Sequence, residues 1–335
     1  MPRIRLPANG WQPRPYQRGL WEYLEGGGRR ACIIWHRRSG KDELCLHWTA
    51  VSAFQKPATY WHMLPEAAQA RKAIWDSINP HTGLRRIDEA FPPEIRDATR
   101  EDQMFLKLKS GATWQVVGSD NFNSLVGSPP YGVVFSEWPL ANPAAYAYLS
   151  PILRENGGWA IFNGTPRGKN HGFKTLQRAL NSDNWFGQVL RADETKAITP
   201  EALAEELADY IGMYGADMGQ AVYDQEYFCS FDAAIIGAYW GAEMAVAERD
   251  GRIGSYAVDP ALPVHTAWDL GVGANLAIWF WQALAGKIAV VDYYQSHDGN
   301  IEAASAEIIS KGYRRGTDWV PHDAKATEIS TGRTR

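Results

Sequence analysis

The chain has 335 residues, a net charge of −4 and three cysteines, and these values exclude several classes of protein. The length allows two domains. The near-balanced charge excludes a uniformly basic body but leaves room for a local basic patch that binds nucleic acid. The cysteines, Cys32, Cys45 and Cys229, form no zinc motif and fit a reducing compartment. No apolar run reaches the roughly 18 residues of a transmembrane helix, and the first residues lack the apolar core of a signal peptide.

The first two thirds of the chain alternate between strand and helix patterns. A helix is expected over residues 13–25. Apolar runs predict strands, in chain order, at 31–35, 59–64, 105–108, 113–117, 132–136 and 159–163. Helical patterns at 43–54, 66–78 and 200–225 fit between and after them. This alternation predicts an α/β domain over residues 1–230, with a mostly parallel sheet covered on both faces.

The segment from Ile33 to Asp42, Ile-Ile-Trp-His-Arg-Arg-Ser-Gly-Lys-Asp, has the pattern of a phosphate-binding loop. An apolar strand leads into a basic turn, and Gly40 and Lys41 open a helix whose N–H groups and lysine attract phosphate. Trp35 stands where glycine is usual. The alternative is a basic loop that caps an ordinary helix.

Four further side chains of this loop fit a nucleotide site. Arg37 and Arg38 add positive charge beside the lysine, and Ser39 lies between them and Gly40. Asp42 stands where Ser or Thr is usual, and its carboxylate is an oxygen ligand suited to magnesium.

A second motif, Tyr-Gly-Val-Val-Phe-Ser-Glu, ends a buried-strand pattern at Glu137. A carboxylate at this place can orient and deprotonate a water molecule beside a bound triphosphate. The usual partner aspartate is Ser136 here, and we expect Asp42 to restore the missing negative charge. The alternative for Glu137 is a solvated strand end.

A third motif, Asn-Gly-Thr-Pro-Arg-Gly-Lys, follows the strand at 159–163. Because the carboxyl ends of parallel strands face the ligand crevice, Asn163 and Thr165 are expected to sense a γ-phosphate. Arg167 and Lys169 are candidates for contacts with phosphate or DNA. Taken singly, each residue fits a polar loop nearly as well.

Together, in this order and spacing, the three motifs resemble the large terminase subunit of tailed bacteriophages, an ATP-driven DNA-packaging motor. The resemblance implies a P-loop ATPase of the ASCE type that binds ATP and Mg²⁺. It implies that Arg37, Lys41 and Glu137 act in catalysis, that residues 37–42 bind the nucleotide, and that Asn163 and Thr165 couple hydrolysis to movement. Pro-Tyr-Gln, ending at Gln17, is similar to the family's adenine-recognition segment.

The resemblance also implies partners and a place of action. These are double-stranded DNA, a portal protein on the procapsid and a small terminase subunit, with the chain a monomer in solution and a ring on the portal. The expected location is the host cytoplasm, with no membrane. Relatives often carry an arginine in the loop before the acidic strand, and Ser124–Gly127 has none here.

After a Gly- and Ala-rich stretch, predicted to be a connector over 231–260, the pattern changes. Three strands (264–271, 276–283 and 287–294), a helix at 300–311 and a strand near 319–322 resemble the RNase H-like nuclease fold. Asp269 and Asp323 would then share Mg²⁺ or Mn²⁺ against a DNA phosphodiester. Taken alone, both are ordinary strand-end carboxylates.

The third carboxylate of such a nuclease normally comes from a later helix. We therefore expect residues 261–335 to be a partial nuclease domain of a longer protein. Asp292 is the one internal substitute worth testing, and a charge on the strand surface is its simpler interpretation.

The sequence thus predicts a motor subunit in which ATP hydrolysis drives double-stranded DNA into a procapsid, with metal-dependent cleavage of concatemeric DNA. Two alternatives remain open. One is a helicase-type DNA-dependent ATPase, and the other is a scaffold that binds nucleotide without hydrolysing it.

Overall fold

The computed structural model describes residues 4–120, 122, 127, 129–232, 240–270, 276–296 and 301–321, and the structural statements below concern these residues. The chain forms two compact units, Met1–Gly241 and Ala242–Arg335, and each is described by itself. None of the helices in the described part of the chain has the length and apolar content that a membrane span needs.

The first unit contains an eight-stranded sheet in the order β3-β4-β5-β2-β6-β7-β1-β8. Its strands are β1 (Arg30–Trp35), β2 (Thr59–Leu64), β3 (Arg96–Arg100), β4 (Phe105–Leu108), β5 (Thr113–Gly118), β6 (Pro130–Phe135), β7 (Trp159–Gly164) and β8 (Phe186–Leu190). All pairings from β5 to β8 are parallel, and β3 and β4 form an antiparallel extension. The predicted mostly parallel sheet is confirmed.

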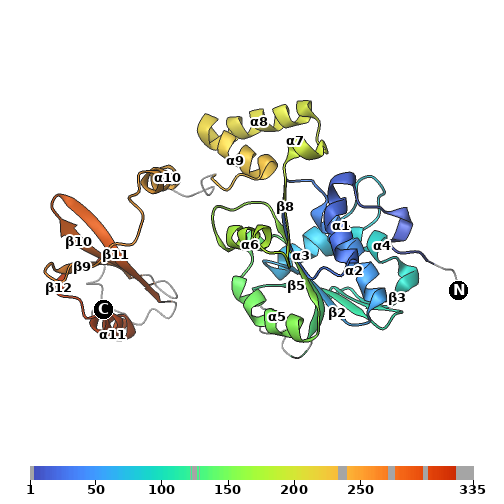
Figure 1. Cartoon of the computed structure of the whole chain (residues 1–335), viewed down its shortest axis with the longest axis horizontal. Helices are drawn as coiled ribbons and strands as arrows, with labels where there is room; N and C mark the ends of the chain where they lie inside the picture. Colours follow the sequence, from blue (N-terminus) through green and yellow to red (C-terminus); the bar gives the residue numbers. More distant parts are fainter. Residues whose placement is uncertain are drawn as a thin grey trace, which may run out of the picture. The chain divides into compact units, whose positions relative to one another are not determined.

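Helices cover both faces of this sheet (Figure 1). They are α1 (Arg18–Glu25), α2 (Lys41–Gln55), α3 (Ala67–Ala70), α4 (Arg86–Ala90), α5 (Pro143–Glu155) and α6 (His171–Leu180), with short turns at Ala8–Gly10, Pro15–Gln17, Arg71–Trp75, Pro93–Ile95 and Trp138–Leu140. One core packs α1, α2 and α4 against the sheet, and the other packs α5 and α6 against its opposite face. The segment predicted as one helix over 66–78 is α3 followed by a π-helical turn that ends at Trp75.

The two strands that sequence patterns missed, β3 and β8, are the outer strands of the sheet. The sequence of β3, Arg-Asp-Ala-Thr-Arg, is mostly exposed, and β8, Phe-Gly-Gln-Val-Leu, is mostly half-buried. An edge strand needs no continuous apolar run because it has only one neighbour and is partly open to solvent.

Three further helices, α7 (Ala192–Thr195), α8 (Pro200–Tyr214) and α9 (Ala216–Phe228), follow β8. They lie beyond the carboxyl end of that strand (Figure 1) and share a small core that includes Leu203 and Tyr227. The single helix expected over 200–225 is two helices because Gly215, with φ +81°, breaks it in a backbone conformation that side chains disfavour. This helical extension carries residues that reach the phosphate loop.

The second unit contains a four-stranded sheet in the order β11-β10-β9-β12. Its elements are α10 (Gly241–Arg249, which starts at the unit boundary), β9 (Val264–Leu270), β10 (Leu276–Leu284), β11 (Lys287–Ser296), α11 (Ile301–Ser310) and β12 (Arg315–Trp319). β9, β10 and β11 are antiparallel, β12 runs parallel to β9, and α11 packs on one face. The expected strands and crossover helix are present, although whether they form a nuclease stays a prediction.

The last strand, expected near 319–322, lies earlier in the chain. Asp318 is opposite Thr266 of β9 and accepts a hydrogen bond from its hydroxyl at 2.6 Å. Pro321 has no N–H to donate, and the strand ends before it.

One buried histidine gives the first unit a testable acid sensitivity. His47, on α2, stacks on Trp11 with ring centroids 4.3 Å apart, and its Nδ1 has no hydrogen-bond partner. Burial lowers the pKa of His47 from its ordinary 6.5 to about 3. Between these values the unfolded chain binds a proton that the folded chain does not, so stability falls as the pH falls.

We expect the free energy of unfolding to drop by about 2 kcal/mol more between pH 7 and pH 5 in the wild type than in His47→Phe, which keeps the ring but cannot titrate. Urea unfolding at both pH values measures the difference. His81→Gln, at an exposed position, is the control and should behave as the wild type. Equal losses in wild type and His47→Phe would show that His47 is not buried in its neutral form.

Candidate functional site

The phosphate-loop candidate connects β1 to α2 at the carboxyl edge of the sheet. Gly40 has φ +76° and precedes the first residue of α2, and Arg38 has φ +67°. Such alternation of backbone handedness points successive N–H groups toward one place, as in anion-binding nests.

Residues that precede α1 hold the loop in place through hydrogen bonds to its backbone. The buried Gln17 donates from Nε2 to the carbonyl of Ser39 at 2.9 Å, and Tyr16 donates its hydroxyl to the same carbonyl at 3.2 Å. The Oε1 atom of Gln17 accepts from the backbone N–H of Arg14 at 3.0 Å. Both ends of the Gln17 amide are therefore used within the chain, and its contact with adenine stays a prediction that requires these bonds to exchange.

The carboxylate of Asp42 joins the loop to the ends of two strands. Its Oδ1 accepts from Ser136 Oγ at 2.7 Å and from Asn163 Nδ2 at 3.0 Å, and His62 Nε2 lies 3.3 Å away. Ser136 follows β6, Asn163 lies on β7 and His62 on β2. The structure thus brings together Asp42 and Ser136, the two residues that depart from the usual pattern.

This network keeps Asp42 ionised. Burial alone would raise the pKa of the carboxyl group, but His62, Lys41 and the Ser136 hydroxyl outweigh burial and hold the pKa well below its ordinary value. The Oδ1 atom of Asn163 is buried and has no partner. A carboxylate, a hydroxyl and a free amide oxygen are ligands that Mg²⁺ prefers, so the residues present fit this ion.

Lys41 and Glu137 face each other across the site. Lys41 Nζ lies 3.6 Å from Glu137 Oε1. Glu137 has φ +50°, an uncommon conformation for a residue with a side chain, at the point where β6 turns into the Trp138–Leu140 helix. The turn places the predicted carboxylate beside the predicted phosphate lysine, from positions almost 100 residues apart in the chain.

The coupling candidates lie at the end of the neighbouring strand. Asn163 and Thr165 are both buried, and Asn163 contacts Asp42 as described above. Pairing of Ile33 with Asn163 and of Ile34 with Gly164 places this strand end beside the start of the phosphate loop. A displacement of Asp42 would therefore be transmitted to β7 through the hydrogen bond between Asn163 and Asp42.

Sequence patterns missed Glu226, which α9 brings to the loop. This buried carboxylate lies 3.6 Å from Arg37 Nη1 through Oε2 and accepts from Arg167 Nη1 at 2.6 Å through Oε1. The backbone N–H of Arg37 also donates to the carbonyl of Glu226 at 2.8 Å. The loop, the segment after β7 and the helical extension therefore meet at one side chain. The sequence signal is weak, because Glu226 is one of two acidic residues in a helix end that mixes polar and aromatic side chains, Tyr-Asp-Gln-Glu-Tyr-Phe.

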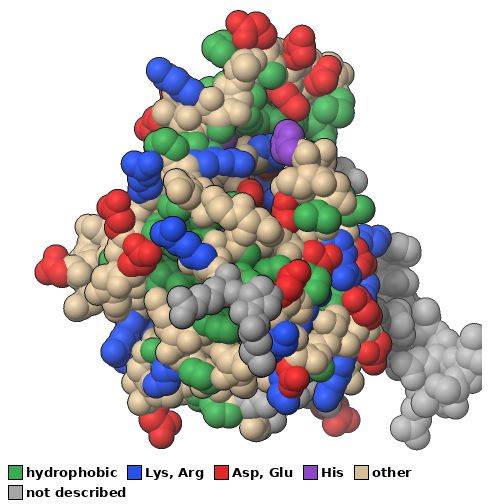
Figure 2. Space-filling view, turned by 90° about the vertical axis from the view of Figure 1, so that its right-hand side faces the viewer, with side chains coloured by type: hydrophobic (Ala, Val, Ile, Leu, Met, Phe, Trp, Pro, Cys, Tyr) green, Lys and Arg blue, Asp and Glu red, His purple; other side chains and the backbone are tan. Residues whose placement is uncertain are grey.

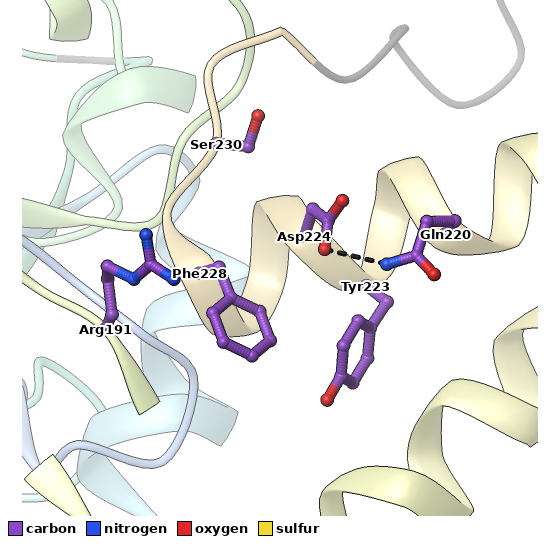
Figure 3. A pocket seen from close by; sticks show the side chains of 6 residues that line it. All are labelled: Arg191, Gln220, Tyr223, Asp224, Phe228 and Ser230. Carbon is purple, nitrogen blue, oxygen red and sulfur yellow. Dashed lines mark hydrogen bonds between the residues drawn. The ribbon is translucent and has the colours of Figure 1, made fainter. Parts of the chain in front are cut away.

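A cavity of about 560 Å³ lies beside the same helix (Figure 3). Arg191 packs over the ring of Phe228 and is paired with Asp193, while Gln220 donates to Asp224 at 2.9 Å. Arg191 is thus held on the cavity side of α9 and does not join the Arg37–Glu226–Arg167 group.

The predicted nuclease residues are only partly within the described chain. Asp269 lies on β9 and is exposed, and Asp323 lies outside the described residues, as does most of the Ser124–Gly127 loop. Asp292 Oδ2 lies 2.7 Å from Lys311 Nζ and accepts from the hydroxyl of Tyr313 at 2.9 Å, so it forms an internal ion pair. Among the residues that the structure describes, no three His, Cys, Asp or Glu side chains gather to hold a metal ion.

The strand order and the phosphate loop define a P-loop ATPase fold. Among solved structures, the chain is similar to a mutant ATPase domain of the large terminase of Thermus phage P74-26, with a TM-score of 0.51 and 19% identity over 66% of this chain and 95% of that one. It is also similar to the large terminase of a thermophilic bacteriophage, with a TM-score of 0.52 and 13% identity over 94% of this chain and 78% of that one. No protein-family model and no curated protein sequence matches the chain. The fold is that of large terminase ATPase domains, as the three motifs predicted.

We expect Glu226→Gln to lower the free energy of unfolding by about 1–3 kcal/mol, because two arginines lose the charge of a buried partner while the side-chain shape is kept. Urea unfolding followed by tryptophan fluorescence measures the change. Glu205→Gln, at an exposed position of α8, is the matched control and should stay within about 0.5 kcal/mol of the wild type. Equal stabilities of the two variants would show that the contacts of Glu226 with Arg37 and Arg167 do not stabilise the fold.

Proposed function

We propose that this protein is an ATPase that drives double-stranded DNA into a viral procapsid. The observation that carries the proposal is the meeting of Lys41, Glu137 and the Asp42 network at the carboxyl edge of a sheet with the large terminase fold. A triphosphate at the N-terminus of α2 would lie where backbone N–H groups, the helix dipole and Lys41 all favour negative charge.

In the proposed hydrolysis, different residues bind the phosphates, activate water and respond to loss of the γ-phosphate. Residues Arg37–Asp42 bind the phosphates, with Arg37 and Lys41 stabilising the charge that develops during phosphoryl transfer. Glu137 orients the attacking water and accepts its proton. Mg²⁺, when bound beside Asp42, would neutralise phosphate charge. Asn163 and Thr165, at the end of β7, respond to loss of the γ-phosphate.

The wider assignment follows from the terminase resemblance. We propose double-stranded DNA as the substrate that is moved, a portal protein on the procapsid and a small terminase subunit as partners, and the host cytoplasm as the place of action. A ring of subunits would form on the portal. Cleavage of concatemeric DNA is proposed for the second unit, with Asp269 and Asp323 as its Mg²⁺ or Mn²⁺ ligands.

Two other functions predict different structures or activities. A helicase-type ATPase has a second, similar α/β domain, whereas the described part of the second unit is a four-stranded mixed sheet with an antiparallel hairpin. A scaffold protein would bind nucleotide without hydrolysis. The paired Lys41 and Glu137 favour hydrolysis over this second alternative.

Replacement of Glu137 by Gln tests the catalytic assignment. We expect the rate of DNA-stimulated ATP hydrolysis with Mg²⁺ to fall by about 10²–10⁴-fold, because the amide cannot accept the proton of the attacking water. Nucleotide affinity, measured with a fluorescent ATP analogue, should change only a few-fold.

Glu155→Gln, at the exposed end of α5, is the control and should hydrolyse ATP as the wild type does. A Glu137→Gln variant that keeps its full rate would show that another group is the base. A wild type that binds ATP but does not hydrolyse it with DNA would favour the scaffold alternative.

A further inference from the structure

A second polar pocket lies at the opposite edge of the first sheet. Its volume is about 800 Å³, and its lining includes the loop between α1 and β1, the end of α5, α6 and the segment before β8. Arg30, Gly158 and Trp185 stand at or just before the amino ends of β1, β7 and β8. Because these strands are parallel, the pocket is separated from the phosphate loop by the length of the strands.

Four arginines line this pocket: Arg29, Arg30, Arg154 and Arg178. None of them forms an ion pair with a carboxylate of the described residues, although Glu22 and Asp183 also line the pocket. The net charge of the lining is therefore positive, on a chain whose total charge is −4. On the face of the molecule shown in Figure 2, basic and acidic side chains are interspersed.

The arginines are held in different ways. Arg30 is buried and donates from Nη1 to the carbonyls of Arg29 and Gly158, each at 2.8 Å. Arg178 packs over the ring of Trp185 at 5.0 Å. Arg29 and Arg154 are exposed, which leaves their guanidinium groups accessible to a ligand.

The frame of the pocket is fixed by hydrogen bonds. The hydroxyl of Tyr23 donates to the carbonyl of Arg30 at 3.0 Å and lies 3.2 Å from that of Asn184, which ties the start of β1 to the approach to β8. The N–H groups of Gly26, Gly27 and Gly28 bond back to α1. The backbone frame of the pocket is therefore formed before any ligand binds, and it loses little conformational freedom on binding.

We propose that this pocket binds phosphate groups of a double-stranded DNA backbone. Guanidinium groups pair with phosphate oxygens through two parallel hydrogen bonds, and a pocket lined by arginine with no lysine suits that geometry. Duplex DNA presents one charge per roughly 1.7 Å of helix axis, so several arginines can each find a phosphate. The proposal rests on the proposed DNA-moving function and adds a contact site to it.

The test measures binding of a fluorescent 20-base-pair duplex to the full chain by anisotropy, at several salt concentrations. Arg154→Gln/Arg178→Gln removes two charges from the rim. We expect affinity to fall about tenfold or more near 100 mM salt, and the slope of log affinity against log salt to decrease by roughly 2. Arg100→Gln/Lys109→Gln, in the antiparallel extension of the first sheet and outside the pocket, removes two exposed charges and should bind as the wild type does. Unfolding midpoints establish that each variant folds.

The outcomes separate this proposal from the proposed function. If the wild type binds duplex DNA and the pocket variant binds equally well, the pocket assignment is wrong and the proposed function stands. If both double variants lose the same affinity, the effect is one of total charge and the assignment is again wrong. If the wild type binds no DNA, the proposed function fails and the pocket assignment fails with it. A pocket variant that binds DNA normally but loses binding to a poly-glutamate peptide would assign the pocket to an acidic protein segment and overturn the DNA proposal.

Discussion

The carboxylate of Asp42 is the constraint on which the arrangement of the proposed nucleotide site depends. It stands at the N-terminus of α2, where the helix dipole favours negative charge, and it holds Ser136 and Asn163 within hydrogen-bond distance. A serine at position 42 would have a shorter side chain and no charge, so it could not contact Ser136, Asn163 and His62 together. An aspartate at position 136 would bring a second carboxylate close to the first, because the Ser136 hydroxyl already lies 2.7 Å from Asp42, and the two like charges would repel each other. The two departures from the usual P-loop pattern therefore require each other, and together they fix the loop against β6 and β7.

The basic side chains around this site are paired with carboxylates. Lys41 lies beside Glu137, while Arg37 and Arg167 share Glu226. Each of these cations has a carboxylate partner within the described chain. If a triphosphate binds here, as we propose, it competes with the carboxylates for the positive groups. Its binding would then free Glu137 to contact water and Glu226 to leave the loop. Because Glu226 lies on α9, this exchange would reach the helical extension directly, whereas Asn163 would transmit it to the sheet.

The sequence predicted the parts of the fold that depend on local patterns. The central strand β2 was predicted to the residue because it is buried along almost its whole length. The strand β4, next to the sheet edge, was also predicted to the residue, because its buried leucines alternate with an exposed lysine. The outer strands β3 and β8 were missed because edge strands lack that signal. The meeting of Lys41 with Glu137 followed from the rule that parallel strands end at one edge. Glu226 was not predictable, since its contact with Arg37 spans almost 190 residues and depends on how α9 packs. In the second unit, the fourth strand was placed too late, because pairing with Thr266, which no local pattern encodes, decides its register.

The proposed nucleotide site and the arginine pocket lie at the two ends of the same strands. β1 begins at Arg30, whose guanidinium binds the backbone beside β7, and ends at Trp35, which leads into the phosphate loop. β7 begins next to Gly158 in the pocket and ends at Asn163 and Gly164. Parallel strands buried on both faces are stiff, and interiors packed at crystal density transmit strain. If the loop shifts in the proposed ATP hydrolysis, the pocket would therefore move together with the sheet. If DNA is held at that pocket, the sheet carries the force, and the site of hydrolysis need not touch DNA at all.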